Sequence, residues 1–450
     1  MIRYRTFLIP LVAAGLVIGA HVVPKPSESP RRPDGVRITQ TTYACPAGAG
    51  ITVAAGQLSP GDKATATVLP GKTADAQLGN PATWRTSEVD GGGVIVEQSG
   101  RASGATGFFG ATARKSSGGG LVVGSCPDLV DDAWYLGLGS GAKHFSSVIL
   151  TNVGDTPAAI DMELWGPEGK IDAVDASGIV IKPFTTKRVR LDDLAAGEPE
   201  LALHVLRRRG SVSAVVNDLS TAVFGGTEPV SATASPRRSQ VIGGLVSGAT
   251  GRTLALLNPG TTTARVEVEV IGPKNTFNPE GLGAVKVKAG AVQLIDVPTT
   301  AGSGRQGLKV TSDVPVAATV RMAPGDKDFA YAEAVPALVG PALVPVEMGK
   351  GVSLPDLILS APGKDSKVEV LALGKDMKQI AEVDVAVNGA TTQHLDTAKA
   401  FTQKGIAYLV LRVKGEVVAA ATYEDAGRIS SLALLSAPLT VLAPQVRPID

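Results

Sequence analysis

The feature that most constrains the fold is a segment that recurs along the chain. A strand-like run ending in Asn152 is followed by Gly166-Pro167, and the same pattern returns 106 residues later with Asn258 and Gly272-Pro273. A third version has Ser360 in place of the asparagine. Self-similarity at a fixed period indicates one structural unit that is copied along the chain. The sequence therefore predicts at least three domains of the same fold.

Within each copy, apolar and polar residues alternate over short runs that Gly, Pro and Asn separate. The clearest run is Val266-Glu267-Val268-Glu269-Val270, in which we expect the valines to face a core and the glutamates to face water. Each copy holds about seven to nine such runs, which is the strand number of an immunoglobulin-like β-sandwich. A β-propeller is the alternative, but its blades of about 40 to 50 residues are only about half as long as this repeat. We therefore expect an all-β fold of tandem immunoglobulin-like β-sandwiches.

The length and composition agree with several β domains. The chain has 450 residues, whereas one domain usually has about 100 to 200. Its 53 Gly and 30 Pro supply turns, and the aromatic content of 4% requires cores of small branched side chains. We place an N-terminal β domain at 36–130 and β-sandwich repeats at 131–238, 239–340 and 341–450. The N-terminal β domain is irregular, but Val94-Ile95-Val96 before Gly107 resembles the closing part of the repeat, which makes this domain a candidate degenerate copy.

The first residues of the chain predict a membrane anchor. Arg3 and Arg5 precede an uncharged apolar run at 6–23, which as a helix would span about 27 Å, close to the thickness of a bilayer core. The run is longer than the apolar region of a typical signal peptide and ends without the small residues of a cleavage site. An uncleaved anchor over 1–24, a single transmembrane helix, is therefore favoured over a signal peptide. A Pro-rich linker is expected at 25–35, with the body of the chain outside the cytoplasm.

The cysteines, histidines and charge narrow the function classes. Cys45 and Cys126 lie near the two ends of the N-terminal β domain, which in an exported chain favours a disulfide bond; two unrelated buried thiols are the alternative. Four scattered histidines show no ligand spacing, so we expect no metal site and no cofactor. The formal net charge is +1, which gives no electrostatic basis for binding nucleic acid.

Two short motifs suggest chemistry only weakly. Ser140 and Lys143 match the Ser-x-x-Lys pattern of penicillin-binding proteins, but they lie in a Gly-rich loop and the partner motifs of that chemistry are absent. Asp128, Asp131 and Asp132 could supply oxygen ligands to calcium, although a solvated turn is the favoured interpretation. No catalytic residue is predicted.

Possible partner contacts come from one charged run and one aromatic residue. Arg207, Arg208 and Arg209 are expected at an exposed hairpin tip, where they would contact an anionic envelope polymer or lipid headgroups; a solvated turn is the favoured alternative. Trp165 stands at the end of a predicted strand, directly before a Gly-Pro turn.

One family resemblance rests on the order of short motifs along the chain. Cys45-Pro46 is followed by Cys126-Pro127, then by Trp134-Tyr135 and by the repeated Leu-x-Asn turns, all after the N-terminal anchor. In this order the chain resembles an uncharacterised actinobacterial family of membrane-anchored envelope proteins with repeated β-sandwich modules. Similar chains tend to be encoded beside a membrane glycosyltransferase, so the resemblance implies a role in cell-envelope glycan biology. No catalytic residue is established for that family.

These observations together predict a non-enzymatic protein at the cell membrane. We expect a single-pass, membrane-tethered array of extracytoplasmic β-sandwiches that acts as a structural or binding module of the cell envelope. The alternative is an accessory subunit that binds an envelope glycan or a lipid-linked sugar for a membrane glycosyltransferase. A hydrolase is a third class, for which the sequence nominates no pair of carboxylates.

Overall fold

The computed structural model describes residues 35–46, 51–59, 63–70, 76–78, 83–86, 92–99, 103–112, 119–221, 225–248, 251–325, 327–346, 348, 352 and 354–442. Within these ranges the regular structure is almost entirely β-strand, so the expected all-β class is confirmed. None of the helices in these ranges has the length and apolar character that a membrane crossing requires. The anchor expected at 1–24 and nearly all of the linker lie outside the described residues.

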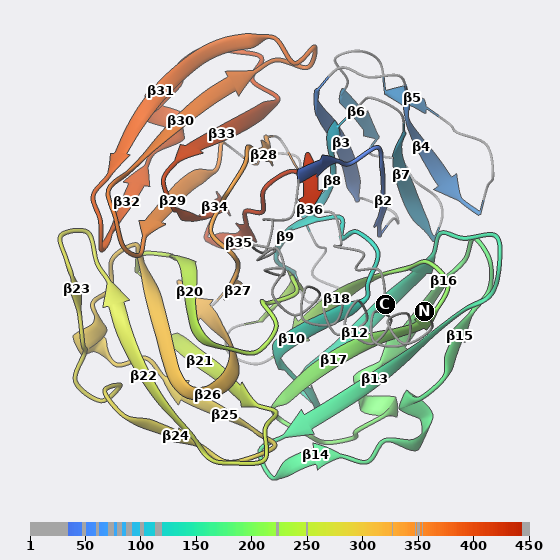
Figure 1. Ribbon diagram of the computed structural model, residues 1–450, viewed down its shortest axis with the longest axis vertical. Coiled ribbons are helices and arrows are strands. Elements are labelled where there is room, and N and C mark those ends of the chain that lie inside the picture. Colours follow the sequence, from blue (N-terminus) through green and yellow to red (C-terminus); the bar gives the residue numbers. More distant parts are fainter. Residues whose placement is uncertain are drawn as a thin grey trace, which may run out of the picture. The chain divides into compact units, whose positions relative to one another are not determined.

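The chain divides into two compact units. The smaller unit contains both ends of the chain and includes a two-stranded antiparallel sheet of β1 (Gly35–Arg37) and β36 (Thr440–Leu442). The larger unit, Ile38–Leu439, holds the other strands and consists of four β-sandwiches, which we number in chain order (Figure 1). Residues 36–37 and 440–450, which we expected in the N-terminal domain and the last repeat, thus belong to the smaller unit.

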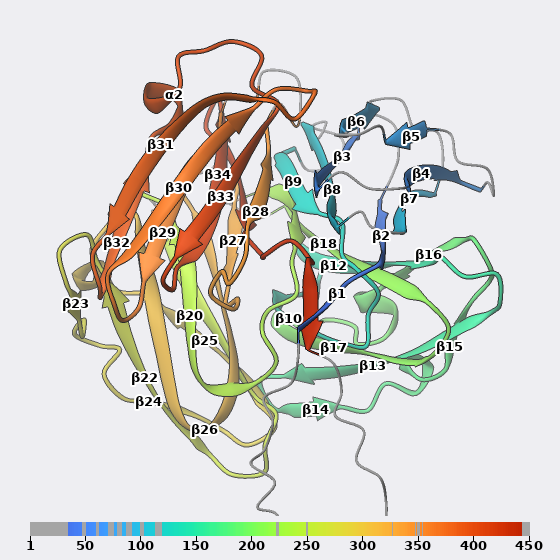
Figure 2. The ribbon, with the colours of Figure 1, turned by 45° about the horizontal axis from the view of Figure 1, so that its top comes forward.

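The strands of the larger unit follow one another in four sets. The first sandwich comprises β2 (Gln40–Cys45), β3 (Thr52–Ser59), β4 (Lys63–Leu69), β5 (Ala76–Leu78), β6 (Thr83–Thr86), β7 (Gly93–Ser99), β8 (Ser103–Thr112) and β9 (Leu121–Ser125). The second comprises β10 (Asp132–Leu138), β11 (Ser140–Gly141), β12 (His144–Asn152), β13 (Ala158–Gly166), β14 (Gly169–Ile171), β15 (Ile179–Ile181), β16 (Thr186–Arg190), β17 (Leu201–Arg209), β18 (Val212–Ser220) and β19 (Gly226–Val230). The third comprises β20 (Arg237–Leu245), β21 (Gly251–Asn258), β22 (Ala264–Ile271), β23 (Thr276–Phe277), β24 (Val285–Val287), β25 (Ala291–Asp296), β26 (Gln306–Ala323) and β27 (Ala330–Glu333). The fourth comprises β28 (Ala342–Pro345), β29 (Asp356–Ala361), β30 (Ser366–Leu373), β31 (Gln379–Val387), β32 (Thr391–Leu395), the one-turn helix α2 (Thr397–Ala400), β33 (Tyr408–Lys414), β34 (Val418–Asp425) and β35 (Arg428–Ala433) (Figure 2).

The four sandwiches share one strand order. When the eight main strands of a sandwich are counted in chain order, one sheet has the order 1-6-3-4 and the facing sheet has the order 5-2-7-8. The first and fourth sandwiches have these strands alone; the second and third add short strands, and in the third β26 supplies both the sixth and the seventh strand. Tandem sandwiches are therefore confirmed. The immunoglobulin-like order is wrong, because an immunoglobulin sheet places the first strand beside the second, whereas here the first strand pairs with the sixth. The shared order supports the hypothesis that the N-terminal β domain is a further copy.

The alternation along the strands places apolar side chains between the sheets. In β22, Val266, Val268 and Val270 are buried, while Glu267 is exposed and Glu269 is half-buried. The second, third and fourth sandwiches each have a buried cluster of this kind, built mainly from Val, Leu, Ile and Ala. Because successive side chains of a strand point to opposite faces, this pattern alone specifies which face of each sheet is packed.

A buried asparagine fixes the turn after the second main strand in two of the sandwiches. The Asn152 Nδ2 donates hydrogen bonds to the carbonyls of Thr156 at 2.8 Å and Ile181 at 3.1 Å, and its Oδ1 accepts one from the Gly154 amide at 2.9 Å. The Asn258 side chain makes the same three bonds to residues 106 positions later. The asparagine that defines the repeat is thus held by its side chain.

Each sandwich contacts the next one, and the fourth also contacts the first. The cross-sandwich hydrogen bonds include those from Thr186 Oγ1 to Gly92 O at 2.7 Å, from Thr233 Oγ1 to Ala318 O at 2.9 Å, from Thr392 Oγ1 to Ile271 O at 2.7 Å and from Tyr408 OH to Ala55 O at 3.1 Å. The larger unit is therefore a closed cycle of four sandwiches. Each sandwich is held to its two neighbours by hydrogen bonds between them as well as by the chain.

Candidate functional site

The last main strands of the four sandwiches meet at one place, which we call the junction. β9 contacts both β19 and β35, and β27 also contacts both β19 and β35. Figure 1 labels β9, β27 and β35 close to one another in the middle of the larger unit. Equivalent strands of the four copies thus come together, and the junction brings side chains from distant parts of the sequence into contact.

Glu228 of β19 joins three sandwiches at the junction. Its side chain is completely buried, and both carboxyl oxygens lie 2.9 Å from the Ser430 Oγ of β35. The Ser431 amide donates a further hydrogen bond to Oε1 at 3.1 Å. Ser430 Oγ in turn accepts a hydrogen bond from the Val123 amide of β9 at 2.9 Å. This network therefore connects the second, fourth and first sandwiches.

Asp328, which directly precedes β27, makes a second set of bonds at the junction. It is completely buried, and its Oδ2 accepts hydrogen bonds from the amides of Leu121 at 2.8 Å and Ile429 at 3.1 Å. Its Oδ1 accepts one from the Phe329 amide at 3.0 Å. A Cβ on Gly226 would lie only 2.1 Å from this Oδ1, so the close approach of β19 requires glycine at that position. Asp328 joins the third sandwich to the first and the fourth.

Glu333, at the end of β27, connects the third sandwich to the second. Its Oε1 accepts a hydrogen bond from the Ser231 amide at 3.0 Å, while its buried Oε2 has no hydrogen-bond partner among the described residues.

Burial raises the pKa of Glu333 to about 7. Burial also raises the pKa of Asp328 to about 7, against the opposing effect of its three amide donors. The pKa of Glu228 is raised still further, by burial and by the nearby Asp328 carboxylate. The junction is thus a cluster of three protonatable acids with almost no access to solvent.

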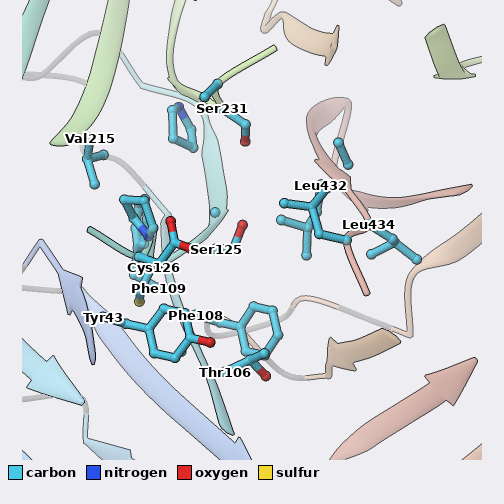
Figure 3. A pocket seen from close by; sticks show the side chains of 18 of the residues that line it. Tyr43, Thr106, Phe108, Phe109, Ser125, Cys126, Val215, Ser231, Leu432 and Leu434 are labelled. Carbon is cyan, nitrogen blue, oxygen red and sulfur yellow. The ribbon is translucent and has the colours of Figure 1, made fainter. Parts of the chain in front are cut away.

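An apolar cavity of about 240 Å³ lies beside the junction. Figure 3 shows the side chains of Tyr43 and Phe108 from the first sandwich, Val215 from the second and Leu432 from the fourth around this space. Thr106 also lines the cavity, and its buried Oγ1 has no hydrogen-bond partner among the described residues. The cavity is built from three sandwiches, so its shape depends on their mutual contacts.

Among the described lining residues of this cavity, Asp128 alone carries a carboxylate. The residue is exposed at the rim, yet packing around its carboxyl group and the nearby Asp131 raise its pKa. The Tyr135 hydroxyl, which also lines the cavity, donates a hydrogen bond to the Ala214 carbonyl at 3.1 Å. The cavity therefore combines aromatic and aliphatic walls with one acidic group.

The Trp165 side chain does not lie on the surface. It is 4% exposed and stacks on Trp134, with ring centroids 5.4 Å apart, where both rings pack against apolar side chains of the third sandwich. His204 also stacks on Trp134, with ring centroids 3.7 Å apart, and its centroid lies 6.2 Å from that of Trp165. The two His204 nitrogens lie 2.8 Å from Asp132 Oδ1 and 3.1 Å from Glu163 Oε2. This aromatic group fills an interface between sandwiches, so Trp165 offers no exposed ring to a partner.

The three arginines lie on the exposed end of β17 and not on a hairpin tip. Arg207 forms an ion pair with Asp131, and Arg208 forms one with Asp161. Arg209 is exposed as well. Two of the three positive charges therefore have carboxylate partners within the same sandwich, which reduces the positive potential of this surface. Asp131 is thus paired with Arg207, and Asp132 contacts His204. No group of three or more residues that could ligate a metal occurs in the described part of the chain.

The polar residues around the Ser-x-x-Lys motif do not form a nucleophile–base pair. Ser140 Oγ accepts a hydrogen bond from the Glu198 amide at 3.0 Å and also bonds the Ala195 carbonyl, while Lys143 is exposed. Nearby, Asp218 lies between His144 Nε2 at 2.9 Å and Ser146 Oγ at 2.7 Å. His144 and Ser146 both contact the carboxylate rather than each other, so among the described residues neither Ser140 nor Ser146 forms the Ser–Lys or Ser–His contact that activates a serine nucleophile.

The expected disulfide bond between Cys45 and Cys126 is present. It connects the end of β2 to the segment that follows β9, and it spans 81 residues. A Cβ on Gly107 would lie 3.0 Å from the Cys126 sulfur, so the neighbouring strand β8 passes close to the bond. The first sandwich is thereby closed covalently near its junction strand.

Comparison with known proteins gives one family and no activity. The model of a family of unknown function, DUF5719, matches residues 85–398. No curated protein matches the chain. Among solved structures, an α-L-rhamnosidase of Streptomyces avermitilis complexed with L-rhamnose is 8% identical, over 88% of this chain and 55% of that enzyme, with a TM-score of 0.13. A TM-score this low carries no argument about fold or function.

Proposed function

Because the chain belongs to the family of unknown function DUF5719, its role has to be inferred from its own residues, and we propose a non-enzymatic module of the cell envelope. In this proposal a single N-terminal helix tethers the chain to the membrane, and the β-sandwiches act outside the cytoplasm as a scaffold for a binding partner.

The main support for the scaffold role is that the buried acids of the junction form hydrogen bonds between sandwiches. Glu228, Asp328 and Glu333 accept hydrogen bonds from Ser430, Leu121 and Ser231, which belong to other sandwiches or to the connections between them. These carboxyl groups hold the four copies together, and their exposure of 0 to 2% leaves no room for a substrate beside them. Acid–base catalysis needs a group within reach of a bound substrate. The arrangement therefore supports a structural role for these acids.

The disulfide bond supports the location outside the cytoplasm. Cys45 and Cys126 are both buried and joined to each other, and no free cysteine remains in the chain. Such bonds form and persist in oxidising compartments and are rare in the cytoplasm. The apolar run at 6–23, which lies outside the described residues, supplies the expected tether.

A second candidate is an accessory subunit that binds a glycan or a lipid-linked sugar for a membrane glycosyltransferase. The exposed Arg209 at the end of β17 favours it, because an arginine can contact an anionic polymer or a phosphate group. The ion pairs of Arg207 and Arg208 reduce the charge that is available there. The scaffold is therefore the preferred proposal.

Cross-linking in intact cells tests both candidates. The tethered full-length chain is cross-linked, purified from membranes and compared with a control in which residues 1–34 carry an unrelated β-sandwich. We expect an envelope protein or polymer that is recovered with the full-length chain and not with the control. Recovery of a membrane glycosyltransferase would favour the second candidate. Identical recovery from both chains would show that the anchor alone is responsible and would contradict the scaffold role.

A further inference from the structure

The cavity beside the junction has the size of a site for a small organic molecule. A cavity of about 150 Å³ lined by Leu, Ile and Phe binds benzene in another protein. The cavity here has about 240 Å³, which leaves room for an aromatic or branched aliphatic body and one further group. Its walls come from preformed strands of three sandwiches, as expected for a site that exists before the ligand arrives (Figure 3).

The electrostatic character of the lining is one-sided. Tyr43, Phe108 and Tyr135 contribute aromatic rings, whose faces carry partial negative charge. Asp128 contributes a carboxylate, and no Lys, Arg or His is among the described residues that line the cavity. An anionic ligand would therefore meet a like charge without any compensating cation, whereas a positive charge would be attracted by the carboxylate and by the rings.

The Asp128 carboxylate differs from its neighbour Asp131 in having no cationic partner among the described residues. Asp131 forms an ion pair with Arg207, but among the described residues no cation pairs with Asp128. The Thr106 hydroxyl, buried in the same cavity, also has no hydrogen-bond partner there. A buried hydroxyl without a partner costs stability, so Thr106 is available to a ligand that would satisfy it. The Asp128 carboxylate, exposed at the rim, is available to a cation.

We propose that this cavity binds an organic cation, in which an amine or quaternary ammonium group is attached to an apolar body. The positive group lies at the Asp128 rim and against the aromatic rings, and the apolar body fills the space between Val215, Leu432 and Leu434. This site concerns the cavity alone and does not depend on the cellular location of the protein.

Two probes of the same shape separate charge recognition from simple filling of an apolar space. Phenyltrimethylammonium carries the positive charge, and tert-butylbenzene replaces its nitrogen by carbon. Binding of each probe to the full-length chain in nanodiscs is followed by ligand-observed NMR. We expect the cation to bind about fivefold to tenfold more tightly than the neutral probe, as contributions from one carboxylate and the aromatic rings imply.

Two matched carboxylate variants and a third variant that fills the cavity test whether the probes bind at this site. Asp128→Asn is expected to remove the preference for the cation, while Asp131→Asn, which changes a neighbouring carboxylate outside the lining, should leave it within about twofold. Ser231→Trp places an indole in the cavity and should abolish binding of both probes. If that variant does not fold, the Asp128→Asn and Asp131→Asn pair still decides the question. Equal binding of the two probes, no binding of the cation, or an unchanged preference in Asp128→Asn would overturn the proposal.

Discussion

Raising the pH from 5 to 8 is expected to destabilise the larger unit through the acids of the junction. Burial raises the pKa of both Asp328 and Glu333 to about 7, whereas an unfolded chain returns them to about 4. Between these values the folded protein binds more protons than the unfolded chain, so stability is present at low pH and is lost as the pH rises toward 7. Between pH 5 and 8 this excess of bound protons extends over about two pH units for each group, and at about 1.4 kcal/mol per unit it gives a loss of about 2.5 kcal/mol for Asp328 and a similar loss for Glu333.

Other charged groups do not reverse this trend. Glu228 acts in the same direction, because burial and the Asp328 carboxylate raise its pKa well above its ordinary value. Arg428, which faces Asp328 from β35, opposes the shift of Asp328 but does not abolish it. Exposed carboxylates whose pKa is lowered by a basic partner, such as Asp192 beside Arg190, contribute stability that is lost only below about pH 4.

Differential scanning calorimetry at pH 5, 6, 7 and 8 measures the effect. An entropy of unfolding of about 2.1 cal/mol/K per residue converts about 5 kcal/mol into a fall in Tm of about 6 °C for a unit of this size. Glu333→Gln keeps the acceptor for the Ser231 amide and removes one titrating group, so its Tm should fall by about 3 °C less than that of the wild-type protein. The exposed Glu267→Gln is the matched control and should follow the wild type. A Tm that is constant or rises from pH 5 to 8 would refute the reasoning.

Three further substitutions test packing and turns, each read as a change in the free energy of unfolding. Asn258→Ala removes three side-chain hydrogen bonds and should cost about 3 kcal/mol. Ser360→Ala, at the equivalent position of the fourth sandwich, removes one side-chain hydrogen bond and should cost about 1 kcal/mol. Equal losses in the two variants would contradict this explanation of the repeat. Gly226→Ala brings a methyl group against the carboxylate at the junction and should lower the Tm by several degrees, while Gly283→Ala, which meets no atom within 4 Å, should not. Trp165→Ala should cost about 3 to 5 kcal/mol, and a change below 1 kcal/mol would show that its ring is not part of the interface.

The sequence predicts the sandwiches because the apolar alternation that defines each strand is contained in a few consecutive residues. The alternation in Val266-Glu267-Val268-Glu269-Val270 specifies which side chains face the core, and the structure buries those valines. Alternation does not specify which strands are neighbours, because any pairing that leaves the apolar side chains on the packed face of the sheet is compatible with it. The strand order was therefore mistaken for that of an immunoglobulin domain, although the strand number was close.

The repeated asparagine shows a second limit of local reasoning. Asn is frequent in turns because it tolerates positive φ, but Asn152 and Asn258 are not among the described residues with positive φ. Their side chains instead bond carbonyls of a strand 29 residues further along, Ile181 and Val287. A spacing in the sequence can locate such a residue, but the partner that explains it becomes visible only in the folded chain.

The junction could not be predicted from any one part of the sequence. Glu228, Asp328 and Glu333 lie in the second and third copies, and their partners lie in the first, second and fourth, so no short motif contains the site. The one available signal was a charged residue inside an apolar run, as in Ala332-Glu333-Ala334-Val335. A buried charge needs a compensating partner, and that rule would have marked Glu333 as a structural or functional residue without showing which.

The thiol state of Cys45 and Cys126 inside living cells tests the central claim most directly. Cells that express the full-length chain are treated with N-ethylmaleimide before lysis, and the peptides are analysed by mass spectrometry without reduction. A variant that lacks residues 1–34 serves as the cytoplasmic control. We expect the full-length chain to yield Cys45 joined to Cys126 and the control to yield two alkylated thiols. Alkylated thiols in the full-length chain would contradict a position outside the cytoplasm, and with it the proposed role in the cell envelope.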